Sequence, residues 1–229
     1  ACICADISSN KQLSKYLLGE QGIPVPYGKV VYSEISAMMA ASQIGMPVVV
    51  KPLDSNQGKG VHLNLNSCSE IREAFLCASK YSSGVIVEQF KKGKDYRVLV
   101  VGSEARAAAQ RVPAHVTGDG RHTVRELIDI ANEDPRRGER HERQLTKIRL
   151  DDVAVTLIKK SGLTPETVPE EGEIVLLREN GNLSTGGTAV DCTDIIHPDN
   201  AELAVRAAAA LGIDIAGIDI VTEDITQSI

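Results

Sequence analysis

The sequence lacks tryptophan altogether, and aromatic residues make up only 3% of its 229 positions. Proteins that bind single-stranded nucleic acid usually stack bases on aromatic side chains, so this scarcity argues against such a platform. The formal net charge of -6 also opposes contact with a phosphate backbone, which binds mainly to lysine and arginine. We therefore expect no nucleic-acid partner.

Long apolar runs and a secretion signal are also missing. No stretch of 18 apolar residues is present that would form a membrane-spanning helix, and the first residues lack the basic start of a signal peptide. The five cysteines, with the histidines, provide no two pairs at the spacing of a zinc finger. These features predict a cytoplasmic protein with reduced thiols and no membrane contact.

Two common phosphate-binding motifs are absent as well. The sequence contains no G-x-x-x-x-G-K-[ST] and no G-x-G-x-x-G that opens a helix after a strand. A different stretch, VVVKPLDSNQGKG at residues 48–60, runs from three valines through Lys51 into a polar loop that ends at Gly60. Such a loop could cradle a polyphosphate with backbone N–H groups and the lysine charge. A plain strand-turn-strand hairpin explains this stretch equally well.

Helix caps and apolar periodicity predict an α+β protein. We expect a lead-in over 1–22 that starts in a strand, a small subdomain over 23–92, and a larger subdomain over 93–229. The charge-dense segment 133–150 is expected to be solvated or mobile. Predicted helices cover 11–20, 34–44, 70–81, 122–134 and 200–211, and predicted strands cover 48–51, 61–66, 85–90, 173–178, 215–221 and a hairpin over 96–113.

Charged residues near one glycine turn and in one apolar strand are candidates for a site. Glu88, Asp95 and Arg97 surround a glycine turn that follows an apolar strand, although an ordinary exposed turn has the same appearance. Asp219 stands in the otherwise apolar stretch GIDIV. A buried carboxylate there would cost several kcal/mol unless it were paired or bound to a metal, so this position departs most from a purely structural explanation.

Two further stretches carry potential anion-binding groups. The stretch QRVPAHVTGDGRHT contains Arg111, His115, Arg121 and His122. Together these side chains suit the binding of a phosphate or carboxylate, but each one alone is more typical of an exposed surface. The histidines have no carboxylate or cysteine partner at ligand spacing, so zinc is not expected. The NLSTGG stretch would offer N–H groups as an anion-binding nest, or form a simple turn.

Taken in order, these segments resemble the ATP-grasp ligases over nearly the whole chain. The resemblance implies an ATP-grasp fold of two α+β subdomains with the nucleotide site between them, and ATP and Mg²⁺ as cofactors. It rests on NKQLSKYLLGEQGIPVP, VVVKPLDSNQGKGV, VIVEQFKKGKDYRVLVV, QRVPAHVTGDGRHTVRELI, NEDPRRGERHE, LRENGNLSTGGTAVDCTD, HPDN and GIDIVTEDI.

The resemblance also assigns roles to residues. It implies that the nucleotide is held by two lysines, a glycine loop, a hinge strand and a ribose-binding carboxylate: Lys11, Lys51, Asn56, Gly58, Lys59, Gly60, Glu88, Gln89, Phe90 and Asp95. It implies that Arg97 and Arg111 bind the transferred phosphate or the substrate carboxylate, and that Asp219 holds Mg²⁺. Substrate-binding residues would be Asp6, Ser184, Thr185 and Gly186.

The reaction implied by the resemblance joins a carboxylate to an amine. ATP would phosphorylate the C-terminal carboxylate of a polyaspartate primer, and the amino group of aspartate would attack the acyl phosphate. Ligation of glycine to γ-glutamylcysteine, and nucleotide or peptide binding without turnover, remain alternatives. The Glu-x-Asn motif that ends such sites does not occur before Ile229, so we expect this stretch to be inactive alone; the parent is expected to be a homo-oligomer.

Overall fold

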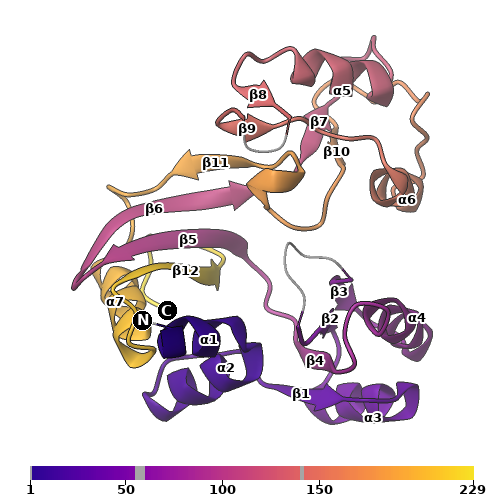
Figure 1. Ribbon diagram of the computed structural model, residues 1–229. Coiled ribbons are helices and arrows are strands. Elements are labelled where there is room, and N and C mark those ends of the chain that lie inside the picture. Colours follow the sequence, from indigo (N-terminus) through magenta and orange to yellow (C-terminus); the bar gives the residue numbers. More distant parts are fainter. Residues whose placement is uncertain (1, 55–59, 140–141) are drawn as a thin grey trace. The chain divides into compact units, whose positions relative to one another are not determined.

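The computed structural model describes the chain except for residues 1, 55–59 and 140–141, and it divides into two compact units (Figure 1). The first unit combines residues 1–108 with 192–229, and the second comprises residues 109–191. Helices pack on strands that pair mainly in antiparallel fashion, so the predicted α+β class is confirmed. Among the described residues, no helix has the length and apolar character needed to cross a membrane.

A four-stranded sheet with two helices on one face forms the middle of the first unit. Its elements are β1 (Gly28–Val31), α3 (Glu34–Ile44), β2 (Val48–Pro52), β3 (His62–Leu65), α4 (Cys68–Ala78) and β4 (Val85–Gln89), with strand order β1-β4-β2-β3. Val48 and Val50 of β2 share a buried core with both helices. Because successive side chains of a strand point to opposite faces, Lys51 and Glu88 project from the other face of the sheet.

Capping residues explain where these helices begin. The hydroxyls of Ser33 and Ser67 each accept a hydrogen bond from the amide three residues later, which forms a capping box at α3 and at α4. The bounds of α3 agree with the prediction, whereas α4 begins earlier than predicted because Ser67, not Ser69, is its cap. Asn10 likewise caps α2 (Lys11–Glu20), which also has the predicted bounds.

The start of the chain differs from the prediction. Residues expected to begin in a strand form helix α1 (Cys2–Ser9). A short apolar run fits a buried strand and a helix equally well by its pattern, and here the helix continues almost directly into α2.

A second sheet has the strand order β11-β6-β5-β12. Its strands are β5 (Lys94–Val101), β6 (Glu104–Val112), β11 (Thr188–Asp191) and β12 (Ile215–Thr222), and the chain enters the second unit along β6. Helix α7 (Pro198–Ala210) packs against β5 and β12, where Val98 and Val100 share a core with Ala204 and Ala208. The alternate residues of β5, Asp95 and Arg97 among them, therefore project from the face away from α7.

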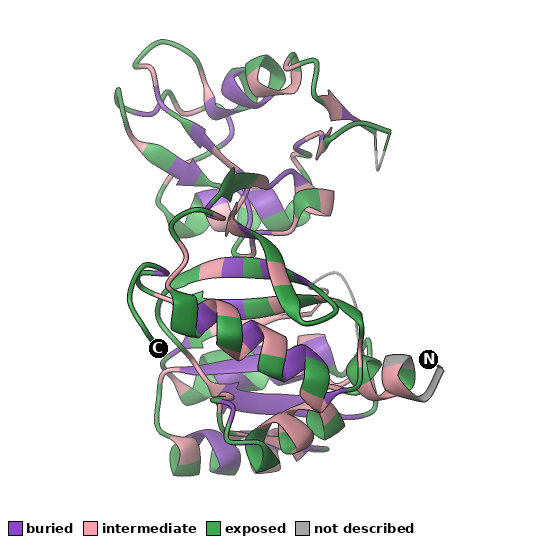
Figure 2. Ribbon diagram, turned by 90° about the vertical axis from the view of Figure 1, so that its left-hand side faces the viewer, coloured by how far each residue is buried: buried purple, intermediate pink, exposed green. Residues whose placement is uncertain are grey.

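The second unit has its own hydrophobic core. Buried residues, purple in Figure 2, lie on strands and on the inward sides of helices. The predicted strand over 173–178 and helix over 122–134 are present, whereas α6 was not predicted. The elements are β7 (His115–Thr117), α5 (Val124–Asn132), β8 (Arg137–Gly138), β9 (Leu145–Thr146), α6 (Asp152–Lys160), β10 (Ile174–Leu176) and the 3₁₀ turn η1 (Leu183–Thr185).

Candidate functional site

Two lysines share one buried carboxylate on the face of the first sheet that points away from α3 and α4. Glu88 of β4 is only 6% exposed, and its carboxylate accepts a hydrogen bond from Lys51 of β2 through Oε1 and from Lys15 of α2 through Oε2. A buried carboxylate needs such partners because its desolvation is otherwise costly. The predicted hairpin is present, since β2 and β3 pair in antiparallel fashion, and Lys51 near the end of its first strand also belongs to a charged cluster.

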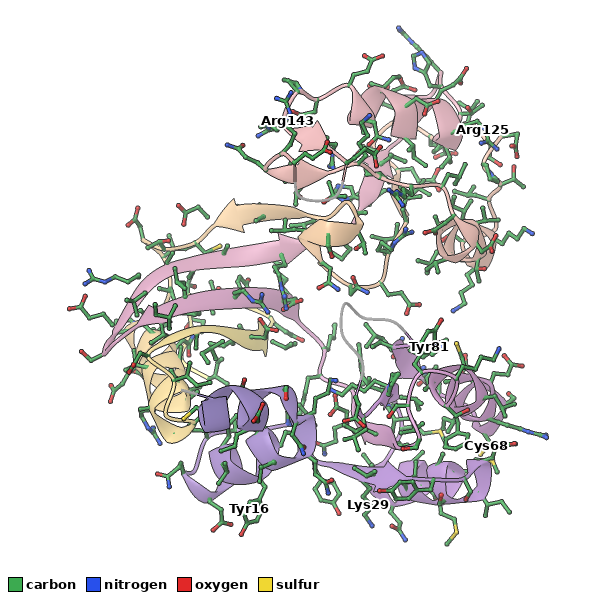
Figure 3. All side chains as sticks on the ribbon, in the orientation of Figure 1. Tyr16, Lys29, Cys68, Tyr81, Arg125 and Arg143 are labelled. Carbon is green, nitrogen blue, oxygen red and sulfur yellow. The ribbon has the colours of Figure 1, made fainter. Side chains whose placement is uncertain are left out.

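Helix α2 supplies the other cations. Lys11 and Lys15 are four residues apart, so both lie on one side of the helix. Lys11 Nζ donates to the Leu53 carbonyl at 3.0 Å, and Lys15 Nζ also donates to the Pro26 carbonyl at 3.2 Å. Tyr16 lies on the solvent side of the same helix (Figure 3).

Burial changes the acidity of these lysines. Desolvation lowers the pKa of Lys11 below its ordinary value, and the neighbouring charge of Lys51 lowers it further. Desolvation also lowers the pKa of Lys15, while the attraction of Glu88 acts in the opposite direction. In this lysine cluster (Lys11, Lys15, Lys51 and Glu88), three ammonium groups set against Glu88 and the nearby Asp54 leave an excess of positive charge, which suits an anionic ligand.

The resemblance assigns nucleotide binding to Gln89 and Phe90, here called the hinge, and to the loop that ends at Gly60. The Gln89 N–H donates to the Tyr27 carbonyl at 2.9 Å and the Phe90 N–H to the Pro47 carbonyl at 3.2 Å, so both amides are used within the protein. Gly60 adopts a φ of 69°, a conformation that favours glycine. Asn56, Gly58 and Lys59 lie outside the described residues.

Arg97 and Asp219 form a two-pronged ion pair across β5 and β12. They stand directly opposite each other, with Arg97 Nε donating to Asp219 Oδ1 at 2.8 Å and Nη2 to Oδ2 at 3.0 Å. This hydrogen bonding raises the pKa of Arg97. The expectation of a buried carboxylate is wrong, because the Asp219 side chain is 46% exposed. Gly217 makes room for the pair: a Cβ there would lie 3.1 Å from Arg97 Cδ.

The NLSTGG stretch forms a closed turn. The N–H groups of Thr185 and Gly187 donate to the Asn182 carbonyl, and the Gly186 N–H donates to that of Leu183. The predicted anion nest from these amides is therefore not formed, because the turn's own carbonyls accept their hydrogens. Ser184 lies half-buried in the same turn.

Part of the charge-dense segment is packed, contrary to the prediction for it. Arg137 Nη1 donates to the Thr146 carbonyl at 2.7 Å and to the Gly186 carbonyl at 3.0 Å, and Gly138 is buried. Burial lowers the pKa of Arg137. The guanidinium thus ties β8 and β9 to the NLSTGG turn, while mobility elsewhere in 133–150 stays a prediction.

The GDGRHT stretch has a structural explanation. Asp119 Oδ1 accepts hydrogen bonds from the Arg121 and His122 amides at 2.9 Å, and Oδ2 lies 2.6 Å from His122 Nδ1. The prediction that His122 lacks a carboxylate partner is wrong, since Asp119 is three residues away. His115 contacts the Pro113 carbonyl through Nδ1. Asp119, Arg121 and His122 thus form the entry to α5, whereas His115 begins β7.

The Asp119–His122 contact predicts a pH effect. The carboxylate raises the pKa of His122 above its ordinary 6.5, and the same contact lowers that of Asp119. The histidine's contribution to stability is therefore complete below pH 6.5 and is lost as pH rises through the raised pKa. We expect NMR titration to show this shift and Asp119→Asn to abolish it; an unshifted His122 in the unmodified chain would contradict the contact.

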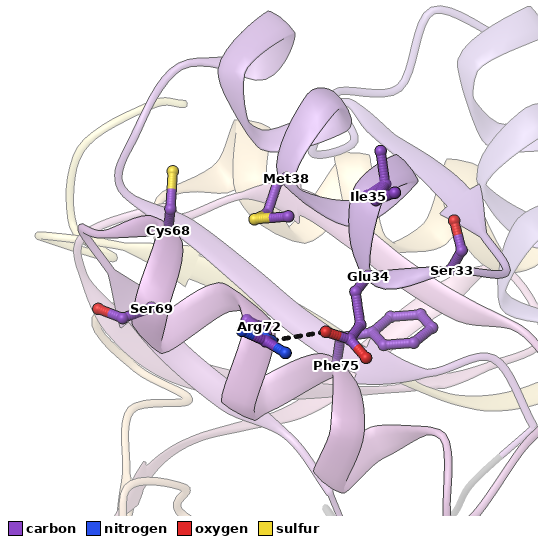
Figure 4. Close-up of a pocket in the computed structure, with 8 residues that line it drawn as sticks. All are labelled: Ser33, Glu34, Ile35, Met38, Cys68, Ser69, Arg72 and Phe75. Atoms are coloured by element: carbon purple, nitrogen blue, oxygen red, sulfur yellow. Dashed lines mark hydrogen bonds and ion pairs between the residues drawn. The ribbon is translucent and has the colours of Figure 1, made fainter.

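A shallow pocket lies between α3 and α4, and the Glu34–Arg72 ion pair crosses it (Figure 4). These helices cover the face of the sheet opposite Lys51 and Glu88, so the pocket is separate from the lysine cluster. Among the described residues, its lining contains no group of side chains that could hold a metal ion. The lining residues are Ser33, Glu34, Ile35, Met38, Cys68, Ser69, Arg72 and Phe75.

A protein-family model matches the part of the chain that contains the lysine cluster. The RimK-like ATP-grasp domain matches residues 8–130, which include α2, the whole first sheet and β5. The chain belongs to the RimK-like ATP-grasp domain family. The matched range includes Lys11, Lys15, Lys51 and Glu88 of the lysine cluster.

Curated relatives of this ATP-grasp chain include two kinds of ligase. Cyanophycin synthetase from Crocosphaera subtropica is 46% identical over 98% of this chain and 26% of its own length. A bifunctional glutathione biosynthesis protein from Enterococcus faecalis is 41% identical over 95% of this chain and 29% of its own length. The chain thus spans between a quarter and a third of the length of these relatives.

Solved structures confirm the predicted ATP-grasp fold. A bifunctional glutathione synthetase from Pasteurella multocida matches all of this chain and 32% of its own, with 33% identity and a TM-score of 0.65. A D-alanine–D-alanine ligase from Bacillus anthracis matches 97% of this chain and 55% of its own, with a TM-score of 0.56. At 13% identity, the second likeness shows the fold alone.

Sequence reasoning missed several residues of this ATP-grasp chain. Lys15 was not assigned a role, although its spacing of four from Lys11 on a predicted helix would have placed both on one side. Arg178, only 7% exposed, donates to Asp151 at 2.7 Å, and no local pattern announces that pair. The predicted residues Arg97 and Asp219 are brought together, whereas Asp6 lies exposed on α1.

Proposed function

We propose that this chain is the ATP-binding and carboxylate-activating part of a carboxylate–amine ligase that extends polyaspartate. ATP would phosphorylate the C-terminal carboxylate of a cyanophycin or polyaspartate primer and release ADP. The amino group of aspartate would then attack the acyl phosphate, forming the amide and releasing phosphate. The observation that carries the proposal is the cluster of Lys11, Lys15 and Lys51 around Glu88 in a chain 46% identical to a cyanophycin synthetase.

The nucleotide is assigned to the first unit. Lys11 and Lys51 would bind its phosphates, because fixed positive charge stabilises the phosphoryl group in transfer. Asp95, half-buried on β5, would accept hydrogen bonds from the ribose. Since the Gln89 and Phe90 N–H groups are already bonded, the hinge would have to hold the adenine through other backbone groups.

The acyl-acceptor side is assigned to arginines and to the NLSTGG turn. Arg97 and Arg111 would bind the transferred phosphate or the terminal carboxylate, for which guanidinium groups have matching geometry. Ser184, Thr185 and Gly186 would contact the primer, chiefly through the Ser184 hydroxyl. Asp6 is retained as a substrate contact only on the strength of the resemblance.

A magnesium ion fits this donor set in part. Mg²⁺ commonly takes one or two carboxylates and fills its other positions with phosphates and water. Asp219 provides one exposed carboxylate, which is paired with Arg97, and no group of three acidic, His or Cys side chains occurs among the described residues. Bound there, the ion would neutralise charge on the phosphates, and Asp219 would be its ligand from this chain.

Two alternatives keep specific support. Glycine ligation to γ-glutamylcysteine is favoured by the 41% identity to a glutathione biosynthesis protein. A screen of amino-acid and peptide acceptors, with ADP release as the readout, separates it from aspartate addition. Binding of ATP or peptide without turnover would give nucleotide affinity but no ADP with any acceptor.

The cellular setting remains part of the proposal. We place the protein in the cytoplasm, where ATP, Mg²⁺ and aspartate are available, with no nucleic-acid or membrane partner. The acidic net charge and the low aromatic content support the absence of a nucleic-acid partner. A homo-oligomeric parent protein is proposed from the resemblance alone.

The test is ATP binding by the unmodified chain and by Lys51→Ala, measured by calorimetry with Mg²⁺. Loss of a charge-assisted bond to phosphate should weaken affinity by about tenfold or more. Lys29→Ala is the matched control, because Lys29 lies on β1 and bonds to Gln43, away from the cluster (Figure 3). Equal affinity in the unmodified chain and Lys51→Ala would contradict the proposed site.

A further inference from the structure

The bonding of Glu88 is unusual in that each carboxylate oxygen has its own lysine. Lys51 takes Oε1 and Lys15 takes Oε2, and the two lysines come from a strand and from a helix far apart in sequence. The Lys15 and Lys51 side chains are 24% and 19% exposed, so neither ammonium is fully solvated. Either ammonium can therefore compensate the single negative charge of the carboxylate.

This arrangement bears on what happens when an anion reaches Lys51. With a single lysine partner, moving the ammonium toward a phosphate would leave Glu88 buried and unpaired, which strongly opposes the move. With Lys15 in place, Glu88 keeps a partner, and the Lys51 ammonium is free to turn. Lys15 is additionally anchored by the Pro26 carbonyl at 3.2 Å, so it stays beside Glu88.

We propose that Lys15 is a positioning residue of the nucleotide site, which holds the Glu88 carboxylate so that Lys51 can exchange it for a phosphate of ATP. The inference rests on the proposed role of Lys51 in ATP binding and adds to it a residue that does not itself touch the nucleotide. Lys15 acts through Glu88, and its effect must disappear when Glu88 carries no charge.

That dependence gives the experiment. ATP affinity is measured by calorimetry with Mg²⁺ for the unmodified chain, Lys15→Met, Lys15→Arg, Glu88→Gln and the double variant Lys15→Met/Glu88→Gln. Lys15→Met should weaken ATP binding by about tenfold, because Glu88 then retains Lys51. Lys15→Arg should bind within about threefold of the unmodified chain, since it keeps the charge. The double variant should regain most of the ATP affinity that Lys15→Met loses, because the neutral amide introduced by Glu88→Gln binds the Lys51 ammonium only weakly.

Controls separate positioning from a general loss of structure. Lys29→Met removes a lysine charge from β1 and should leave affinity unchanged, and urea unfolding of every variant reports its stability. Should Lys15→Met fail to fold, Lys15→Gln with and without Glu88→Gln makes the same comparison. A purely structural Lys15 would give a double variant no better than Lys15→Met.

The outcomes are distinguishable. Normal ATP affinity in Lys15→Met, or no recovery in the double variant, would overturn the role of Lys15 while leaving that of Lys51 intact. Absence of ATP binding by the unmodified chain would overturn the proposed function, and this inference with it.

Discussion

Replacing Asp219 with asparagine in the full-length protein is expected to slow ADP release by about a thousandfold, because the proposed magnesium site loses its carboxylate. The fold should hardly change. The Arg97–Asp219 pair is about half exposed on both sides, and exposed pairs contribute about 1 kcal/mol or less to stability. A large loss of turnover with a small loss of stability would therefore mark Asp219 as functional.

The measurement is ADP release with Mg²⁺, aspartate and a cyanophycin primer, beside urea unfolding of the same variant. Glu223→Gln provides a matched control, because it removes one carboxylate just past β12 whose contact with Lys92 is 4.0 Å long. Turnover by Asp219→Asn within about tenfold of the unmodified protein would contradict the assignment. An equal loss in Glu223→Gln would point to net charge instead.

Substituting alanine for Gly118 should lower the free energy of unfolding of the second unit by about 3 kcal/mol. A Cβ at this position would lie 2.1 Å from the Glu170 carbonyl oxygen and 2.8 Å from Pro169 Cβ. The backbone cannot easily withdraw, because Gly118 both donates to the Glu173 carbonyl at 2.8 Å and accepts from the Gly172 amide at 2.9 Å. To accommodate the added methyl group, one of these hydrogen bonds must break or the turn beside β10 must change its conformation.

Urea unfolding followed by circular dichroism checks this expectation. Gly19→Ala is the control for alanine itself: Gly19 lies within α2, and its nearest neighbour would be Val25 Cγ2 at 4.0 Å. Alanine in a helix should stabilise the chain by about 0.5–1 kcal/mol. If Gly118→Ala were as stable as the unmodified chain, the close approach at Glu170 would be wrong.

Local signals account for what could be predicted from sequence. Caps at Asn10 and Ser33 define α2 and α3, and the alternation of β2 explains why Lys51 emerges from an otherwise buried strand. The α+β class and the ATP-grasp fold followed from such elements and from their order. The prediction of a strand after residue 1 was wrong, because this apolar run is too short to distinguish a strand from a helix and no capping residue marks its structure.

Contacts between distant residues account for the rest. Lys15 meets Glu88 across 73 positions of sequence, and Arg97 meets Asp219 across 122, so no local spacing reveals either pair. In the NLSTGG turn, the residue types suit an anion nest. Which carbonyls accept the amide hydrogens is decided by the turn's conformation, and that was not evident from composition.

The close contact between Gly217 and the Arg97 side chain also has an evolutionary consequence. The Arg97 side chain lies against Gly217 and pairs with Asp219, which is on the same strand as Gly217. Positions 217 and 219 therefore share one steric constraint with position 97, which is distant in sequence. We expect homologues with a larger residue at position 217 to lack the arginine at position 97, or to place the cation that pairs with position 219 on β12 instead. Covariation between these columns, with 219 held acidic, would be the signature of this shared constraint.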